Sequence, residues 1–216
     1  PMTGPPDPMA QPSHGTSPWN LPNALTALRI LLVPVFGSML LVEGGSNAPQ
    51  RFAALAVFIV AMITDRIDGD IARSRGLVTD VGKILDPIAD KALLGMAFVG
   101  LSLIGLVPWW VTLLVLAREV GVTVVRFVVI RHGVMPAGRG GKIKTVAQAV
   151  ALSLLVLPAW VLPVPDVWRW TAYIVLAIAV ALTVLTGLDY LVQANRLRRT
   201  SPRAMAKRAV REAGRA

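Results

Sequence analysis

Six of the twelve acidic residues in this 216-residue chain fall within one stretch, residues 64–91. The stretch lies between hydrophobic runs that are long enough to cross a membrane, where a carboxylate is costly and marks a functional site by default. Carboxylate oxygens are the ligands that hard cations such as Mg²⁺ and Mn²⁺ prefer. The stretch therefore predicts a metal site formed by Asp65, Asp68, Asp86 and Asp90.

The spacing of these aspartates predicts two helical faces. Asp65 and Asp68 lie three positions apart and Asp86 and Asp90 lie four apart, so each pair shares one side of a helix. A turn near residues 76–80 would place the two helices side by side. The four carboxylates would then repel one another unless a cation compensated their charge. Small residues on the same faces permit close approach of a helix or a ligand: Gly69, Ala72 and Gly82.

Hydrophobic runs must position these side chains. The chain is 55% hydrophobic and 16% charged, with a mean hydropathy of +0.63, a combination that is rare in soluble domains. Each membrane span needs about 20 residues. We therefore expect an all-α, polytopic membrane protein with six transmembrane helices in one bundle. The expected spans are 21–42, 52–75, 82–104, 109–130, 145–162 and 170–192.

The aspartate stretch resembles the signature of a known enzyme family. Its pattern, Asp-x2-Asp-Gly-x2-Ala-Arg-x8-Gly-x3-Asp-x3-Asp, begins at Asp65 and ends at Asp90. All eight fixed positions match the signature of the CDP-alcohol phosphatidyltransferases. The resemblance implies an integral membrane enzyme that transfers a phosphatidyl group from CDP-diacylglycerol to an alcohol and releases CMP. It also implies a homodimer.

The same resemblance implies roles for the residues of the signature. Asp65, Asp68 and Asp86 would bind Mg²⁺ or Mn²⁺. Asp90 would be the base that accepts the proton of the acceptor hydroxyl, and it would also contact a metal ion. The CDP pocket would be formed by Asp68, Gly69, Ala72, Arg73 and Gly82.

Basic residues further along the chain predict a binding site for a phosphorylated acceptor: Arg118, Arg126, Arg131, Lys142 and Lys144. They favour sn-glycerol 3-phosphate over a neutral alcohol, although a buried pair with Glu119 would account for one of the arginines. The run GKIKTVAQ at residues 141–148 resembles the phosphatidylglycerophosphate synthases of this family. Inositol phosphate would also need cations, and a cardiolipin synthase that uses phosphatidylglycerol is the nearest alternative.

The first span carries a further polar group. Arg29 lies inside the apolar run, where it either extends to the interface or contacts a phosphate. The run PNALTALR at residues 22–29 resembles the opening helix of the same synthases. This favours contacts to the lipid diphosphate from Asn23, Thr26 and Arg29.

The distribution of charge predicts the orientation in the membrane. The net charge is +10, and the basic residues gather at the ends of spans, where they mark the cytoplasmic face and anionic lipid rather than nucleic acid. We expect a bacterial inner membrane (cell membrane) protein with both termini and the active site in the cytoplasm. The chain would divide into a flexible segment 1–20, a catalytic domain 21–195 and a basic tail 196–216.

Two alternatives from other classes use intramembrane carboxylates. An ion-coupled transporter would carry cations or protons on them, but no inverted repeat is visible in the sequence. An intramembrane prenyltransferase also uses aspartates and Mg²⁺, but it resembles a longer bundle with a different aspartate spacing. Ion transport in sealed vesicles without CMP release would favour the first, and CMP-independent use of a prenyl diphosphate the second.

Overall fold

A computed structural model describes residues 21–74, 80–129 and 139–200. No strand occurs in these residues, which confirms the predicted all-α class. Two 3-10 helices, η1 (Val42–Gly45) and η2 (Ala159–Val161), lie in connections. The six α-helices are α1 (Leu21–Leu41), α2 (Ala48–Ser74), α3 (Asp80–Leu103), α4 (Trp109–Val129), α5 (Arg139–Val156) and α6 (Pro165–Thr200).

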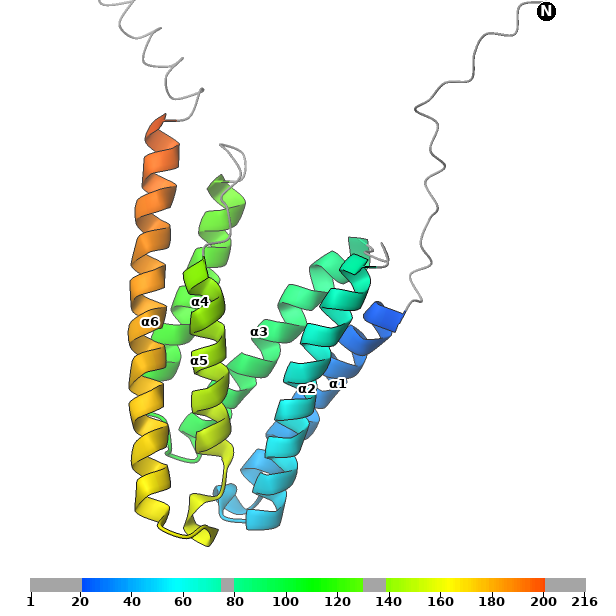
Figure 1. The fold of residues 1–216 in the computed structure, drawn as a ribbon, viewed down its shortest axis with the longest axis vertical. Coiled ribbons are helices and arrows are strands. Elements are labelled where there is room, and N and C mark those ends of the chain that lie inside the picture. Colours follow the sequence, from blue (N-terminus) through cyan, green and yellow to red (C-terminus); the bar gives the residue numbers. More distant parts are fainter. Residues whose placement is uncertain (1–20, 75–79, 130–138, 201–216) are drawn as a thin grey trace, which may run out of the picture.

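The helices alternate in direction and form two groups of three (Figure 1). Helices α1, α2 and α3 pack together, as do α4, α5 and α6, and packing within each group is more extensive than packing between the groups. The groups meet at one end of the bundle and diverge toward the other (Figure 1). At the diverging end α2 ends and α3 begins, so this end carries the aspartate stretch.

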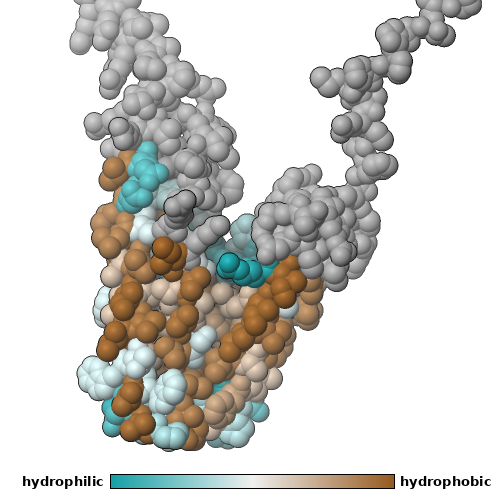
Figure 2. Space-filling view, in the orientation of Figure 1, coloured by the Kyte–Doolittle hydropathy of each residue, from teal (hydrophilic) through white to brown (hydrophobic). Residues whose placement is uncertain are grey.

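Three helical segments in the described part are long and apolar enough to cross a membrane: Asn23–Gly45, Ala48–Ile67 and Pro165–Gln193. A shorter apolar helix covers Ile143–Val156. Helices α3 and α4 have 24 and 21 residues, but charged residues of the candidate site interrupt their apolar sequence. Much of the outer surface of the bundle is hydrophobic (Figure 2). These apolar helices indicate a membrane protein.

Tryptophans mark the end of the bundle that lies opposite the aspartates. Trp109 and Trp110 open α4, Trp160 lies in η2, and Trp168 and Trp170 lie in the first turns of α6. Each of the five is at least 39% exposed. Tryptophan is enriched where a membrane meets water, because its ring is amphipathic. The band therefore indicates a membrane surface at this end.

Close packing inside the first group depends on a missing side chain. A Cβ atom on Gly100 of α3 would lie 2.7 Å from Leu40 Cδ2 of α1, so α1 and α3 approach closely only because residue 100 is glycine. Phe36 of α1 and Phe58 of α2 add an aromatic contact, with ring centroids 5.5 Å apart. These contacts hold α1 against the two helices that carry the aspartates.

Arg51, in the first turn of α2, joins the two groups at the tryptophan end. Its side chain is 2% exposed. Nε donates to the carbonyl of Val156 at 2.8 Å, Nη2 donates to the carbonyl of Leu155, and Nη1 donates to Gly45 O at 3.2 Å. Its guanidinium also lies 5.1 Å from the centroid of the Trp160 ring. The arginine thus satisfies carbonyls that the end of α5 leaves unpaired.

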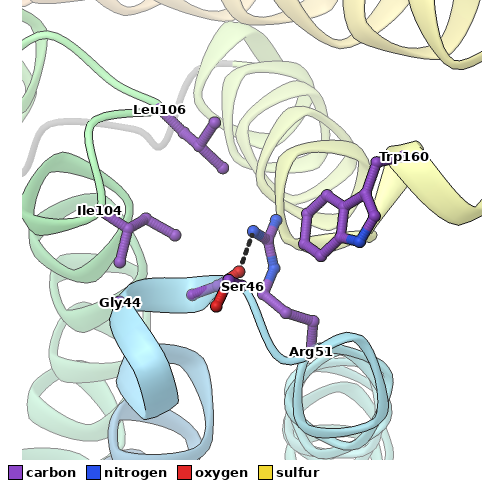
Figure 3. A pocket seen from close by; sticks show the side chains of 7 residues that line it. Gly44, Ser46, Arg51, Ile104, Leu106 and Trp160 are labelled. Atoms are coloured by element: carbon purple, nitrogen blue, oxygen red, sulfur yellow. Dashed lines mark hydrogen bonds between the residues drawn. The ribbon is translucent and has the colours of Figure 1, made fainter.

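A cavity of about 380 Å³ lies beside this arginine (Figure 3). Its lining combines Arg51 and Trp160 with Gly44, Ile104 and Leu106. The donors of Arg51 are directed at backbone carbonyls, and the cavity lies at the end away from the aspartates. It is therefore part of how the connections pack and not of the candidate site.

Helix α5 departs from its predicted span at both ends. The helix begins at Arg139 and ends at Val156, whereas the sequence predicts a span over 145–162. The glycine-rich run at its start is helical, and Pro158 follows its end. Lys144 consequently lies in the second turn of α5.

Candidate functional site

Helix α1 supplies hydrogen-bond donors to two of the signature aspartates. Thr26 Oγ1 donates to Asp86 Oδ1 of α3 at 2.6 Å. Arg29 Nη1 forms an ion pair with Asp65 Oδ1 of α2. Thr26 and Arg29 are each 1% exposed and lie one turn apart on α1. The structure thus brings two predicted lipid-diphosphate contacts against two predicted metal ligands, in what we name the aspartate cluster: Thr26, Arg29, Asp65 and Asp86.

A second cluster joins the helices of the other group. Glu119 Oε1 of α4 accepts from its neighbour Arg118 Nη1 at 3.1 Å and from Lys144 Nζ of α5. Arg118 Nη2 donates to Thr186 Oγ1 of α6 at 2.9 Å. Lys144 is 4% exposed, so its charge is compensated inside the protein and not by water. We name these residues the Glu119 cluster: Arg118, Glu119, Lys144 and Thr186.

Asp90 interacts electrostatically with both clusters. It is half-buried and follows Asp86 by one turn of α3. Its carboxylate is influenced by the charges of Asp65 and Arg29 in the first group of helices and by those of Glu119 and Lys144 in the second. The predicted base therefore lies within electrostatic range of both polar groups.

A hydrogen-bonded link connects α3 to α4 next to Asp90. Lys91 Nζ donates to Thr123 Oγ1, which donates to the backbone carbonyl of Glu119 at 2.8 Å. Lys91 thus extends from α3 to the other group of helices. Hydrophilic surface is visible where the groups diverge (Figure 2).

No local pattern in the sequence predicts the roles of Glu119, Thr123 and Thr186. The sequence leaves a pair between Glu119 and one arginine as an alternative, and the carboxylate pairs with Arg118 and also with Lys144. The available signal for Glu119 was that it is the single acid in an apolar helix that also carries arginines. The two threonines gave no signal, because threonine in an apolar helix commonly bonds to its own backbone.

Other predicted site residues are placed only in part. Gly82 is buried in the first turn of α3, and Asn23 is half-buried in the first turn of α1. Arg131 lies outside the described residues. The backbone is helical, and the side chain lies outside the described part, at Asp68, Gly69, Ala72, Arg73, Arg126 and Lys142.

The donor types of the aspartate cluster suit a hard divalent cation. Asp65, Asp86 and Asp90 contribute only carboxylate oxygens, and two of these groups are already oriented by donors from α1. Among the described side chains, no three residues of the Asp, Glu, His and Cys types lie close enough to hold an ion together. Asp68, the fourth predicted ligand, is not among those side chains.

Comparison with known proteins decides the class. The family model for CDP-alcohol phosphatidyltransferase matches residues 19–185, which contain the aspartate cluster, Asp90 and Lys144. The chain belongs to the CDP-alcohol phosphatidyltransferase family. It is therefore an enzyme of the phosphatidyltransferase class, as the aspartate signature predicted. This family membership argues against both the transporter and the prenyltransferase alternatives.

Several relatives within the CDP-alcohol phosphatidyltransferase family are similar along most of their length. A probable phosphatidylglycerophosphate synthase of Mycobacterium tuberculosis (strain ATCC 25618 / H37Rv) is 51% identical over 177 residues, 82% of this chain and 82% of the relative. The CDP-diacylglycerol–glycerol-3-phosphate 3-phosphatidyltransferase of Bacillus subtilis (strain 168) is 40% identical, covering 80% of this chain and 93% of the relative. The enzyme of the same name from Escherichia coli (strain K12) is 37% identical with the same coverage.

Proposed function

We propose that this chain transfers the phosphatidyl group of CDP-diacylglycerol to sn-glycerol 3-phosphate, giving phosphatidylglycerophosphate and CMP for phospholipid biosynthesis. The names of the relatives support this acceptor. The observation that carries the proposal is that Asp90 lies within electrostatic range of both a cluster that contains carboxylates and a cluster with two cations. The carboxylates suit a metal-bound diphosphate, and the cluster with two cations suits the phosphate of the acceptor.

On the donor side, we propose that Asp65, Asp68, Asp86 and Asp90 hold Mg²⁺ or Mn²⁺. When bound, the cation neutralises the diphosphate charge and orients the reacting groups. Thr26 and Arg29 keep the carboxylates of Asp86 and Asp65 in place. We also propose that the lipid diphosphate is contacted directly by Asn23, Thr26 and Arg29. The CDP pocket is assigned to Asp68, Gly69, Ala72, Arg73 and Gly82.

At the reacting centre, the acceptor hydroxyl oxygen forms a bond to the lipid-side phosphorus while the bond from that phosphorus to the CMP oxygen breaks. Asp90 takes the hydroxyl proton, which requires a base within hydrogen-bonding distance. Arg118 and Lys144 bind the phosphate of the acceptor and so bring its hydroxyl to Asp90. The remaining acceptor-site residues of the proposal are Arg126, Arg131 and Lys142.

We further propose that all six helices cross the membrane, with both termini and the active site on the cytoplasmic side. The alternation of the helices and the tryptophan band at the opposite end support a bundle that crosses the membrane with both termini on one side (Figure 1). The basic residues of the sequence at that side support the cytoplasmic assignment. The basic tail 196–216, which begins within α6, would contact anionic lipid, and segment 1–20 lies outside the described residues. We also propose that the protein forms a homodimer in a bacterial inner membrane.

The test is CMP release by purified protein in detergent with CDP-diacylglycerol and Mg²⁺. Glycerol 3-phosphate, inositol phosphate and phosphatidylglycerol are supplied separately as acceptors. We expect release with glycerol 3-phosphate alone, loss of release in Asp90→Asn, and no change in Asp166→Asn, an exposed aspartate at the other end of the bundle. Release only with phosphatidylglycerol or inositol phosphate would replace the proposed acceptor and retain the donor site.

A further inference from the structure

We propose that Glu119 is a positioning residue for the acceptor phosphate, a role that rests on the function proposed above. Its carboxylate oxygen Oε1 accepts from both Arg118 Nη1 and Lys144 Nζ. The two cations come from different helices, α4 and α5, and they converge on one oxygen. Without this negative charge they would repel each other in a low-dielectric interior and separate.

Helix α6 fixes the other side of Arg118. Thr186 Oγ1 accepts from Arg118 Nη2 at 2.9 Å. A Cβ atom on Gly187 would lie 3.1 Å from Arg118 Cγ and 3.4 Å from its Nε, so the arginine lies against bare helix backbone. Arg118 Nε is buried and has no hydrogen-bond partner among the described residues. A phosphate oxygen of a bound acceptor would supply the partner that this donor lacks.

Hydrogen bonds also hold the Glu119 cluster in position relative to α3, which carries the proposed base Asp90. Lys91, the residue after Asp90, donates to Thr123, and Thr123 donates to the carbonyl of Glu119. The position of the acceptor cations is therefore fixed relative to α3, which carries Asp90. Glu119 acts through these cations and does not itself contact the acceptor, so its loss should affect acceptor binding selectively.

The test compares Michaelis constants for the two substrates in Glu119→Gln, Glu119→Asp and Gly187→Ala. Glutamine keeps the size of the side chain and removes its charge. We expect Glu119→Gln to raise the KM for glycerol 3-phosphate about tenfold or more, the effect of losing one charge-assisted contact. The KM for CDP-diacylglycerol should stay within about twofold in the same variant, because the donor-side contacts are unchanged.

Two further variants separate positioning from folding. Glu119→Asp keeps the charge and should recover part of the acceptor affinity. Gly187→Ala displaces Arg118 without touching Glu119, and it should raise the KM for glycerol 3-phosphate with the KM for CDP-diacylglycerol unchanged. If Glu119→Gln does not fold, Glu119→Asp decides, because withdrawing the carboxylate by one methylene should raise the KM for glycerol 3-phosphate and leave the KM for CDP-diacylglycerol unchanged.

The outcomes also distinguish this inference from the proposed function. A wild-type enzyme that is inactive with glycerol 3-phosphate rejects the proposed function itself. If the wild type is active and Arg118→Ala and Lys144→Ala raise the acceptor KM, an unchanged or lower KM in Glu119→Gln overturns the positioning role. A lower KM would show that the carboxylate competes with the acceptor for the two cations. Equal rises for both substrates would indicate a purely structural role and would also overturn the inference.

Discussion

Arg29 of α1 forms an ion pair with Asp65 of α2 in which the arginine side chain is 1% exposed and the aspartate side chain is 38% exposed. A charged residue inside the first apolar helix is thus used to hold a carboxylate of the signature. The pair makes α1 part of the support for the proposed metal site.

Removal of this arginine should weaken both folding and catalysis. We expect Arg29→Ala to destabilise the protein by roughly 1–3 kcal/mol, less than for a fully buried pair because Asp65 is partly exposed to solvent. Thermal unfolding in detergent, followed alongside CMP release, measures both effects. Arg66→Ala is the matched control, since Arg66 is adjacent to Asp65 but exposed. Equal losses in the two variants would show that the ion pair contributes nothing specific.

The hydroxyl of Thr26 should tune the metal requirement. Thr26→Val removes the donor to Asp86 at constant shape, and we expect the Mg²⁺ concentration for half-maximal activity to rise about tenfold. Thr26→Ser keeps the hydroxyl and should remain close to wild type. Activity measured across a Mg²⁺ titration, after chelation of endogenous metal, gives the comparison. An unshifted titration in Thr26→Val would contradict the proposed support of Asp86.

Arg51 should contribute to stability and not to the reaction. Arg51→Ala leaves carbonyls at the end of α5 without their donor, which we expect to cost roughly 3 kcal/mol. Arg169→Ala is the control at the same end of the bundle: its pair with Asp166 is exposed and should be worth under about 1 kcal/mol. Melting temperatures of the two variants in one detergent test this. A KM change in Arg51→Ala without loss of stability would argue against a structural role.

Adjacent glycines in η1 provide a matched pair for backbone strain. Gly44 and Gly45 both have positive φ, at 63° and 79°, so alanine is disfavoured at either position by roughly 1–2 kcal/mol. A Cβ on Gly45 would also lie 2.8 Å from Ile104 Cδ1, whereas one on Gly44 meets open space. We expect Gly45→Ala to be the less stable variant by about 1–3 kcal/mol, since overpacking adds to strain. Equal melting temperatures for the two alanine variants would refute the contact with Ile104.

Long apolar runs made the helices predictable. The first predicted span, 21–42, agrees with α1 (Leu21–Leu41) because hydrophobicity alone delimits it. The start of α5 was not predictable in this way, since its glycine and lysine residues favour a loop locally and only packing against α6 explains the helix. The spacing of Asp86 and Asp90 placed both on one helix, which the structure confirms.

Contacts between helices could not be predicted from the sequence. Thr26 and Asp86 lie 60 positions apart, and Arg118 and Thr186 lie 68 apart. Each contact depends on how α1 packs on α3 and how α4 packs on α6, which no local pattern encodes. The basic residues were predicted as a set, but the carboxylate that holds two of them together became visible only with the helices in place.

The two polar clusters follow one another along the chain and are divided at the turn after α3. Every described member of the aspartate cluster, and Asp90, precedes residue 104, and every member of the Glu119 cluster follows residue 108. A Cβ atom on Gly105 in this turn would meet open space. Neither half of the polypeptide holds the proposed polar partners of both substrates, so two inactive fragments divided there should complement each other when they are produced together in one membrane.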